Sequence, residues 1–324
     1  RGNYMKASVL RTASRGMIIF LYFISRIIPL KWGYCLCGAL GGITCNVMSG
    51  HRKTAMNNLE IAFGEGLSLP KRKEICRGMF GNMVKSLYEF LHFTRFSETD
   101  ITSMVELDGS IIRKYTAGGR GVIVLTAHMG NWELLGARVV AEGFKLTVIG
   151  KNLRDVWLNR LMHRLRKSAG VENISKGKGI FNPVVEALQR NEIVGLLADQ
   201  NAGSDGCFVD FFGKTASTFT GPAVFAAHTG AVILPAFCIR QKDNSHKVIF
   251  YDPIFPASPS NKETIYECAK EYTRCIERVV REYPEQWLWI HKRWKTQPDP
   301  ENPEALVKCE ERGERTCGEG SRNI

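Results

Sequence analysis

Apolar residues dominate the first fifty positions, but a polar break interrupts them. Residues 17–24 are wholly apolar, and Ser25 and Arg26 separate them from the apolar run 27–30. The unbroken run is shorter than the ~20 residues that a membrane-spanning helix needs. A second apolar stretch, rich in Gly and Cys, follows at 32–48. We expect this second stretch to be either a re-entrant partner of the first or a buried helix.

Three arginines and a tyrosine in and before the first stretch share one helical stripe. At 100° per residue this narrow stripe collects Arg11, Arg15, Tyr22 and Arg26, with apolar residues around it. Such arginines can reach lipid headgroups while the rest of the helix lies in the membrane interface or spans the membrane with help. We therefore predict that residues 1–50 are an N-terminal membrane-anchoring helical segment. A helix docked on a soluble core is the alternative.

Beyond residue 50 the hydrophobic pattern is that of a mixed α/β protein. Helical periodicity covers 53–64 and 70–93, and from residue 120 short apolar runs alternate with helical patterns. The predicted strands are 121–127, 145–149, 193–198, 231–238 and 247–252, and the predicted helices are 133–142, 155–169, 183–190, 222–229 and 262–283. A long loop is expected at 199–220, and an aromatic segment follows at 286–294.

This alternation predicts an α/β fold with a mixed, largely parallel central sheet that is flanked by helices on both faces. Ligands in such sheets bind at the carboxyl ends of the strands. We predict that residues 51–297 form the enzymatic domain. The tail 298–324 is rich in Glu, Arg, Gly and Pro and is expected to be disordered.

The net charge indicates what kind of partner the chain attracts, and the cysteine pattern indicates the redox state of its thiols. The 324-residue chain has 44 Lys and Arg against 32 Asp and Glu, a net charge of +12, and a pI near 9.3. Attraction to a polyanion follows, but charge alone does not choose between nucleic acid, an anionic membrane, a phosphorylated lipid and an acidic protein. The ten cysteines form no CxxC pair, so we expect reduced thiols, no disulfide framework and no zinc site.

The candidate chemistry lies at the end of the first strand of this region. The sequence there reads Thr126-Ala-His128-Met-Gly-Asn-Trp-Glu133, a His at a strand tip and a Glu in the first turn of the following helix. A carboxylate that holds one imidazole nitrogen leaves the other free to accept a proton, which would make His128 a general base. Alternatively, His128 is a capped strand-end residue and Glu133 only favours the helix N-terminus.

The chain lacks the sequence motifs of several other enzyme classes. The chain contains no GxSxG nucleophile elbow and no Walker A loop, and its glycine cluster 118–121 precedes a strand instead of following one. These observations disfavour an acyl-enzyme, ATP chemistry and a dinucleotide cofactor, so no cofactor is expected. They favour direct attack by a bound hydroxyl on an activated acyl carbon.

The run from His128 to Glu133 resembles the HxxxxD/E motif of glycerolipid-type acyltransferases, in the form found in the lipid A biosynthesis lauroyl/myristoyl acyltransferase family. Further blocks agree in order and spacing. They include Asn58-Leu59 with Phe63, Glu89, Ala198-Asp199-Gln200, Phe211-Phe212-Gly213, Gly221, Thr229-Gly230-Ala231, Pro235 and the closing Pro284-Glu-Gln-Trp-Leu-Trp-Ile-His-Lys-Arg-Trp-Lys295. The resemblance covers about residues 20–296.

The resemblance implies transfer of a fatty acyl chain from acyl carrier protein to a hydroxyl of the di-Kdo lipid A precursor, at the cytoplasmic face of the inner membrane. An acidic carrier and a phosphorylated glycolipid would both be drawn to a chain of charge +12. The resemblance also implies that His128 and Glu133 are catalytic. The expected mechanism is one-step transfer, in which Glu133 stabilises the imidazolium of His128.

Further residues are expected to bind substrate. They are Asn131 of the motif, Asp199, an Arg that is either Arg164 or Arg166, and the alternating His291, Arg293 and Lys295. We favour Arg166 as the phosphate or carbonyl contact, and the alternative is a solvated basic helix face. Alternation along a strand would place His291, Arg293 and Lys295 on one face, where they would meet phosphate or carboxylate groups. Core packing is the alternative for that block.

Competing functions stay open at this point. Nucleic-acid binding would use the positive charge, but no helix-turn-helix or RNP-like motif is present and the basic residues are dispersed. A membrane-associated thioesterase would use the same His and Glu with water as acceptor. An acyltransferase for another glycolipid or aminolipid, using acyl carrier protein or acyl-CoA, is the remaining alternative.

Overall fold

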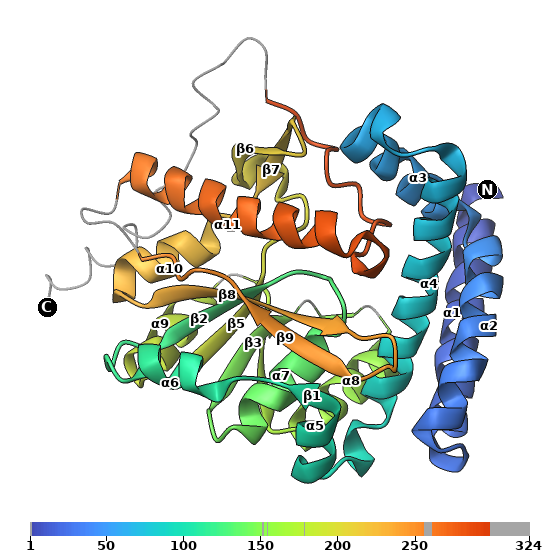
Figure 1. Cartoon of the computed structure of the whole chain (residues 1–324), viewed down its shortest axis with the longest axis horizontal. Coiled ribbons are helices and arrows are strands. Elements are labelled where there is room, and N and C mark those ends of the chain that lie inside the picture. Colours follow the sequence, from blue (N-terminus) through green and yellow to red (C-terminus); the bar gives the residue numbers. More distant parts are fainter. Residues whose placement is uncertain (1, 151, 154, 178, 256–260, 299–324) are drawn as a thin grey trace, which may run out of the picture.

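In the computed structural model, a seven-stranded sheet lies between two layers of helices, and a helical hairpin stands at one side (Figure 1). The structure describes residues 2–298 except 151, 154, 178 and 256–260, with side chains described from residue 15 onward. The predicted disordered tail lies outside the described residues from 299 onward.

The sheet has the order β1-β9-β8-β2-β5-β3-β4, and all neighbours are parallel except β8 and β9. Its strands are β1 (Val105–Glu106), β2 (Val122–Thr126), β3 (Leu146–Gly150), β4 (Val171–Ser175), β5 (Ile193–Leu197), β8 (Val232–Arg240) and β9 (His246–Phe250). This confirms the prediction of a mixed, largely parallel sheet. The strands at its centre are apolar on both faces, as a sheet covered on both sides requires.

The predicted loop 199–220 is wrong in one respect, because it contains a separate antiparallel hairpin, β6 (Cys207–Phe211) and β7 (Lys214–Thr218). Strand β4 also lies outside the predicted elements. Phe212 and Gly213 form the two-residue turn of the hairpin, both at positive φ, as the favoured hairpin turns require.

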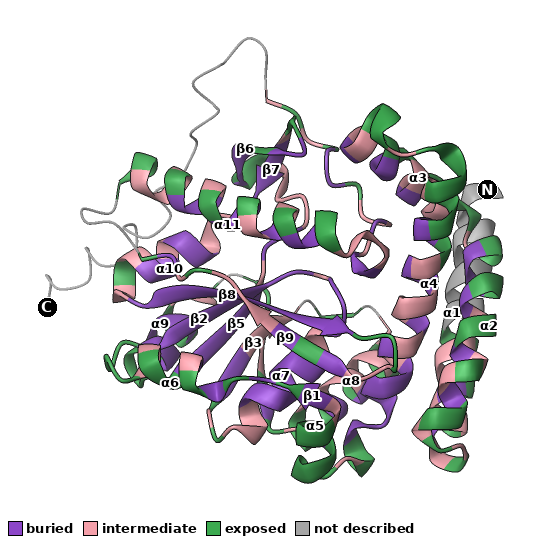
Figure 2. Cartoon of the chain, viewed as in Figure 1, coloured by how far each residue is buried: buried purple, intermediate pink, exposed green. Residues whose placement is uncertain are grey.

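Two layers of helices cover the sheet (Figure 1). One core contains α9, α10 and α11 together with Ile123 and Leu125 of β2, and the other contains α5, α6, α7 and α8 together with Val122 and Val124. The helices are α5 (Glu98–Met104), α6 (Gly109–Thr116), α7 (Trp132–Ala141), α8 (Val156–Ser168), α9 (Phe181–Gln189), α10 (Gly221–Thr229) and α11 (Lys262–Glu282). Buried residues therefore gather along the sheet and on the inner helix faces (Figure 2).

The N-terminal helices are α1 (Gly2–Ile27), α2 (Leu30–Val47), α3 (Ser49–Phe63) and α4 (Leu69–Leu91). The hairpin of α1 and α2 packs against α4 (Figure 1). Small residues allow this approach, since a Cβ on Gly41 would lie 2.6 Å from the Cα of Gly81. None of the described helices combines the length and the apolar character that a membrane crossing requires.

The aromatic segment 286–294 does not form the strand that alternation suggested. After a single 3-10 turn, Pro284–Gln286, the chain crosses the carboxyl end of the sheet in turns, with one isolated bridge between Met129 and Trp287. Trp287 and Trp289 are buried and stack edge to face, with ring centroids 4.6 Å apart. The segment therefore closes the core beside the tip of β2.

Candidate active site

His128 lies beyond the carboxyl end of β2, beside a carboxylate from the neighbouring strand. Thr126 pairs with Leu197 in the parallel ladder of β2 and β5, so His128 and Asp199 each follow their strand by two residues. The Nδ1 of His128 lies 2.9 Å from Oδ1 of Asp199, and the backbone N–H of His128 donates to Oδ2 at 3.0 Å. The sheet register therefore brings together an imidazole and a carboxylate that are 71 residues apart.

Asp199 is held as a carboxylate inside the protein. Its side chain is 2% exposed, and Trp287 Nε1 donates to Oδ2 at 2.8 Å. Burial alone would raise the pKa of Asp199, but the charge of His128 and the hydrogen bonds from His128 and Trp287 outweigh burial and lower it. Asp199 thus holds the imidazole, which corrects the expectation that it binds substrate.

Glu133 has a different partner from the one expected. Arg166 binds it through two hydrogen bonds, Nε to Oε2 at 3.0 Å and Nη2 to Oε1 at 2.6 Å. Among the described residues no hydrogen bond joins Glu133 to His128, so the expected contact between them is wrong. The two side chains have partners on different elements. Glu133 binds Arg166 of α8, whereas His128 binds Asp199, which follows β5.

Arg166 is the arginine of α8 that reaches the site, whereas Arg164 is exposed. Its third nitrogen, Nη1, donates to Asn173 at 2.8 Å. Burial would lower the pKa of Arg166, but the hydrogen bonds and charge of Glu133 raise it. The ion pair is largely shielded from solvent, with side-chain exposures of 15% and 13%. Bidentate geometry of this kind fixes both side chains.

Trp132 links the two pairs. Its ring lies edge to face with the His128 imidazole, centroids 5.1 Å apart, and its Nε1 donates to Oε1 of Glu133 at 3.2 Å. Gln200 approaches from the other side, with Nε2 3.5 Å from Nε2 of His128. The sequence interpretation missed Gln200, although it directly follows Asp199 in the Ala-Asp-Gln block.

The turn between His128 and α7 is enclosed by backbone contacts. Gly130 has a φ of 56°, and a Cβ there would lie 1.9 Å from the carbonyl oxygen of Cys238. Its N–H donates to the carbonyl of Gln286 at 3.0 Å, and the N–H of Asn131 donates to the carbonyl of Cys238 at 3.0 Å. Only glycine fits this close approach of two backbones.

Asn131 was expected to bind substrate, and the structure places it otherwise. Its side chain is buried and accepts hydrogen bonds from the N–H groups of Glu133 and Leu134, which caps α7. Its amide nitrogen donates to Oε2 of Glu89 at 2.6 Å. Both ends of the amide are thus engaged, and Asn131 positions the motif.

The C-terminal candidates do not share one face. Arg293 is 1% exposed and donates to the carbonyl of Ser217 and to the hydroxyl of Thr218. It is therefore a packing residue that holds β7, which corrects the expectation of a phosphate contact. Lys295 is exposed, and His291 is half-buried. Burial lowers the pKa of His291, as do the nearby charges of His128 and Arg293.

An apolar cavity of about 380 Å³ ends at the turn between His128 and α7. Asn131, Trp132 and Glu133 form that end, and the walls come from α1, α2, α4, α8 and the segment before α8. The apolar wall residues are Met17, Ile18, Leu21, Val47, Met48, Met83, Val84, Leu87, Phe90, Leu91, Leu153, Leu158, Leu161, Met162 and Leu165. The volume is that of a small-molecule site, and the lining suits a hydrocarbon.

Comparisons with known proteins agree with this arrangement. Residues 3–296 match the family described as bacterial lipid A biosynthesis acyltransferase. The chain is 25% identical over 268 residues to the lipid A biosynthesis palmitoleoyltransferase of Escherichia coli K12, covering 82% of this chain and 85% of that protein. It is 27% identical over 270 residues to the lipid A biosynthesis lauroyltransferase of the same organism, covering 81% and 85%.

A third relative is named for a different acceptor lipid. The phosphatidylinositol mannoside acyltransferase of Mycobacterium tuberculosis H37Rv is 32% identical over 181 residues, which is 55% of this chain and 56% of that protein. The match to the lipid A acyltransferase family extends over nearly the whole chain, and its range includes His128, Glu133, Arg166 and Asp199. The chain therefore belongs to the bacterial lipid A biosynthesis acyltransferase family and is an acyltransferase that acts on lipid A or a related glycolipid.

Proposed function

We propose that this enzyme transfers a fatty acyl chain from acyl carrier protein to a hydroxyl of the di-Kdo lipid A precursor at the cytoplasmic face of the inner membrane. The observation that carries the proposal is the placement of Asn131, Trp132 and Glu133, the last three residues of the motif, at one end of an apolar cavity of about 380 Å³, with His128 against the ring of Trp132. An acyl chain lying in this cavity would present its thioester carbonyl to the polar end.

His128 is the proposed general base. Because the carboxylate of Asp199 can only accept, it favours the proton on Nδ1 of His128 and leaves the lone pair of Nε2 free. Nε2 takes the proton of the acceptor hydroxyl while the hydroxyl oxygen forms a bond to the thioester carbon. The carbon–sulfur bond then breaks, and the thiolate leaves with the proton from the imidazolium. Asp199 stabilises that imidazolium while it exists.

Glu133 and Arg166 are proposed to stabilise the wall of the site. In this proposal neither of them takes part in the proton transfer. Three of the five N–H groups of Arg166 already donate to Glu133 or Asn173, which fixes its guanidinium against Glu133. The backbone N–H of Trp132, the first residue of α7, donates to none of the turn or loop acceptors among the described residues. We propose this N–H as the oxyanion donor, supported by the positive end of the helix dipole.

Membrane association is supported by the outer surface of the hairpin. Phe20, Phe23, Ile27 and Trp32 are 50%, 61%, 79% and 75% exposed. Clustered apolar side chains of this size on one hairpin mark an interaction surface, and a lipid acceptor requires access to a membrane. Arg26 lies beside them, over the ring of Tyr22 at 4.6 Å, where it can meet headgroup phosphates.

A specific observation favours a second candidate for the acceptor lipid. Similarity to the mycobacterial phosphatidylinositol mannoside acyltransferase over about half the chain favours a mannosylated inositol lipid as second candidate. Both acceptors combine sugar hydroxyls with phosphate, so the same charge and the same base serve either one.

Mass spectrometry of lipid A from a strain that lacks a late acyltransferase, complemented with this chain, tests the proposal. We expect one added acyl chain with the wild-type protein and none with His128→Ala. Unchanged lipid A with a newly acylated mannosylated inositol lipid, in a host that makes both, would instead support the second acceptor. Free fatty acid released in vitro at equal rates with and without acceptor would indicate a thioesterase.

A further inference from the structure

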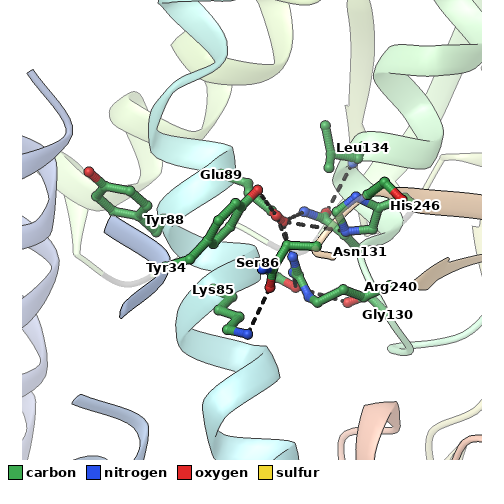
Figure 3. Close-up of polar contacts among 12 residues, drawn as sticks. Tyr34, Lys85, Ser86, Tyr88, Glu89, Gly130, Asn131, Leu134, Arg240 and His246 are labelled. Carbon is green, nitrogen blue, oxygen red and sulfur yellow. Dashed lines mark hydrogen bonds and ion pairs between the residues drawn. The ribbon is translucent and has the colours of Figure 1, made fainter. Parts of the chain in front are cut away.

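A buried polar cluster lies behind the catalytic turn, away from the proposed reacting atoms. Its centre is Glu89 of α4, whose side chain is fully buried. Figure 3 shows Asn131 and Arg240 at its carboxylate, with Tyr34 on the side of α2 and His246 on the side of β9. Four separate elements thus meet at one carboxylate, although the proposed chemistry uses none of these side chains directly.

The two carboxylate oxygens of Glu89 share Arg240 and differ in their other partners. Oε1 accepts from Tyr34 at 2.7 Å and from Nη1 of Arg240. Oε2 accepts from Nη2 of Arg240 at 2.8 Å and from Nδ2 of Asn131 at 2.6 Å. Arg240 compensates the buried charge, since a buried carboxylate without such a partner is strongly unfavourable. Asn131 is therefore an additional partner, which the charge balance of Glu89 does not require.

The contact determines how the amide of Asn131 is oriented. An ionised carboxylate accepts hydrogen bonds and donates none, so only the NH2 end of the amide can face Glu89. The carbonyl end then faces α7, where it accepts from Glu133 N at 3.1 Å and from Leu134 N at 3.0 Å. A flipped amide would aim two donors at these N–H groups and its oxygen at the carboxylate. Both contacts would be repulsive.

Burial would raise the pKa of Glu89, but the charge and hydrogen bonds of Arg240 lower it, which keeps the carboxylate ionised. The capped N–H of Glu133 belongs to the residue whose side chain meets Arg166 and lines the apolar cavity. A continuous chain of contacts therefore runs from Glu89 through Asn131 to the first turn of α7.

We propose that Glu89 is a positioning residue for the acyl transfer, which selects the amide orientation of Asn131 and so fixes the first turn of α7 at the site. This inference rests on the proposed function only for its effect on turnover. Its effect on α7 exists in the resting protein and is measured without any substrate.

Hydrogen exchange of backbone amides, resolved at single residues, tests the effect on α7. In Glu89→Gln the new amide both donates and accepts, so it no longer selects one orientation of Asn131. We expect the N–H groups of Glu133 and Leu134 to exchange at least tenfold faster. The matched control is Tyr34→Phe, which removes a hydrogen bond to the other oxygen of Glu89 and should leave both rates within twofold. Unchanged exchange in folded Glu89→Gln would overturn the proposal.

A cycle of variants tests the effect on turnover. Asn131→Ser keeps an oxygen that can cap α7 but cannot reach Glu89. We expect Glu89→Gln to lower kcat at least tenfold in the wild-type background, with KM for the acyl donor within twofold, and less than threefold in the Asn131→Ser background. Equal effects in both backgrounds would show that Glu89 acts through stability alone and would contradict the proposal.

Asn131→Asp extends the test to a chain that keeps Glu89 and its pair with Arg240. This variant places a second carboxylate against Oε2 of Glu89, and two close carboxylates bind one proton more readily than either alone. We expect kcat, relative to wild type at the same pH, to be low near neutral pH and to recover as the pH falls. A ratio that is constant with pH would overturn the proposal. Absence of transfer in the wild-type chain would contradict the proposed function alone, because the exchange rates would still decide the role of Glu89.

Discussion

At the carboxyl ends of β2 and β5, two residues that are far apart in sequence form one hydrogen-bonded pair. His128 and Asp199 are joined by two hydrogen bonds, and Trp287 fixes the second oxygen of the carboxylate. The carboxylate favours the tautomer that leaves Nε2 of His128 free. A substitution of Asp199 should therefore change the tautomer of His128 and, with it, the rate.

Asp199→Asn should lower kcat at least ~10²-fold, because an amide NH2 facing Nδ1 would favour the proton on Nε2 and block the base. The substitution preserves shape, so the melting temperature should change little compared with the loss of turnover. The control Asp205→Asn, in the same loop segment, should keep wild-type kinetics. Wild-type turnover in Asp199→Asn would remove Asp199 from the mechanism.

His246 provides a prediction about stability. Burial lowers its pKa to about 4, so in the folded state it stays neutral through the range in which an unfolded His, with a pKa near 6.5, takes up a proton. Unfolding then binds a proton, and stability that is present above about pH 6.5 is lost as the pH falls toward 4. The loss between pH 7.5 and pH 4.5 should be about 2 to 3 kcal/mol from this group.

Urea unfolding of wild type and His246→Gln at these two pH values checks the point. His92 and His291 have pKa values shifted in the same direction and titrate in both proteins, so the comparison isolates His246. We expect a smaller loss of stability on acidification in the variant. Equal losses in the two proteins would mean that His246 is protonated in the folded state.

At the scale of elements, the sequence predicts most of the sheet but not its closest contacts. Apolar runs such as 121–127 predicted β2 because buried parallel strands are apolar on both faces. Strand β4 carries Glu172 and Asn173 and lacks that signal. The contact between His128 and Asp199 depends on β5 lying beside β2, which is a consequence of strand order and not of local pattern. Glu133 was therefore the natural but wrong partner for the imidazole.

The walls of the cavity give a prediction about chain length. Met162 of α8 lines the cavity and is half-buried. Met162→Trp should fill part of the space and lower kcat/KM for a long acyl donor more than for a short one, because an overfilled cavity excludes the end of the chain. Competition between palmitoyl and lauroyl donors measures this ratio.

The control for cavity filling is Arg160→Trp, an exposed position on the same helix that does not line the cavity. It should leave the preference between the two donors unchanged. A ratio that shifts equally in both variants, or in neither, would show that the cavity does not hold the acyl chain.

At the scale of the whole molecule, the hairpin of α1 and α2 combines two surfaces. Its inner side closes the apolar cavity through residues such as Met17 and Leu21, and its outer side exposes large apolar side chains. The sequence pattern predicted a helix with apolar residues around most of its circumference, which is now explained by packing on one side and exposure on the other. Which side of the hairpin is exposed is decided by tertiary packing, which periodicity does not report.

The triple substitution Phe20→Ser, Phe23→Ser and Ile27→Ser removes exposed apolar area while leaving the buried side of α1 intact. We expect at least tenfold weaker binding to anionic phospholipid vesicles, since each burial of a large apolar side chain contributes about 1.5–3 kcal/mol at most. Vesicle co-sedimentation measures the change. The control Phe255→Ser, equally exposed but outside the hairpin, should bind as wild type does. Unchanged binding of the triple variant would place the membrane contact elsewhere.

The most direct test of the proposed function is the rate of acyl transfer by purified protein from acyl-loaded carrier protein to a di-Kdo lipid A precursor, with His128→Ala measured beside wild type. We expect acyl transfer by the wild-type protein, a loss of at least ~10²-fold in the variant, and no acyl group retained on either protein when donor is supplied alone. Wild-type rates in His128→Ala, or an acyl chain covalently bound to the wild-type protein, would contradict it.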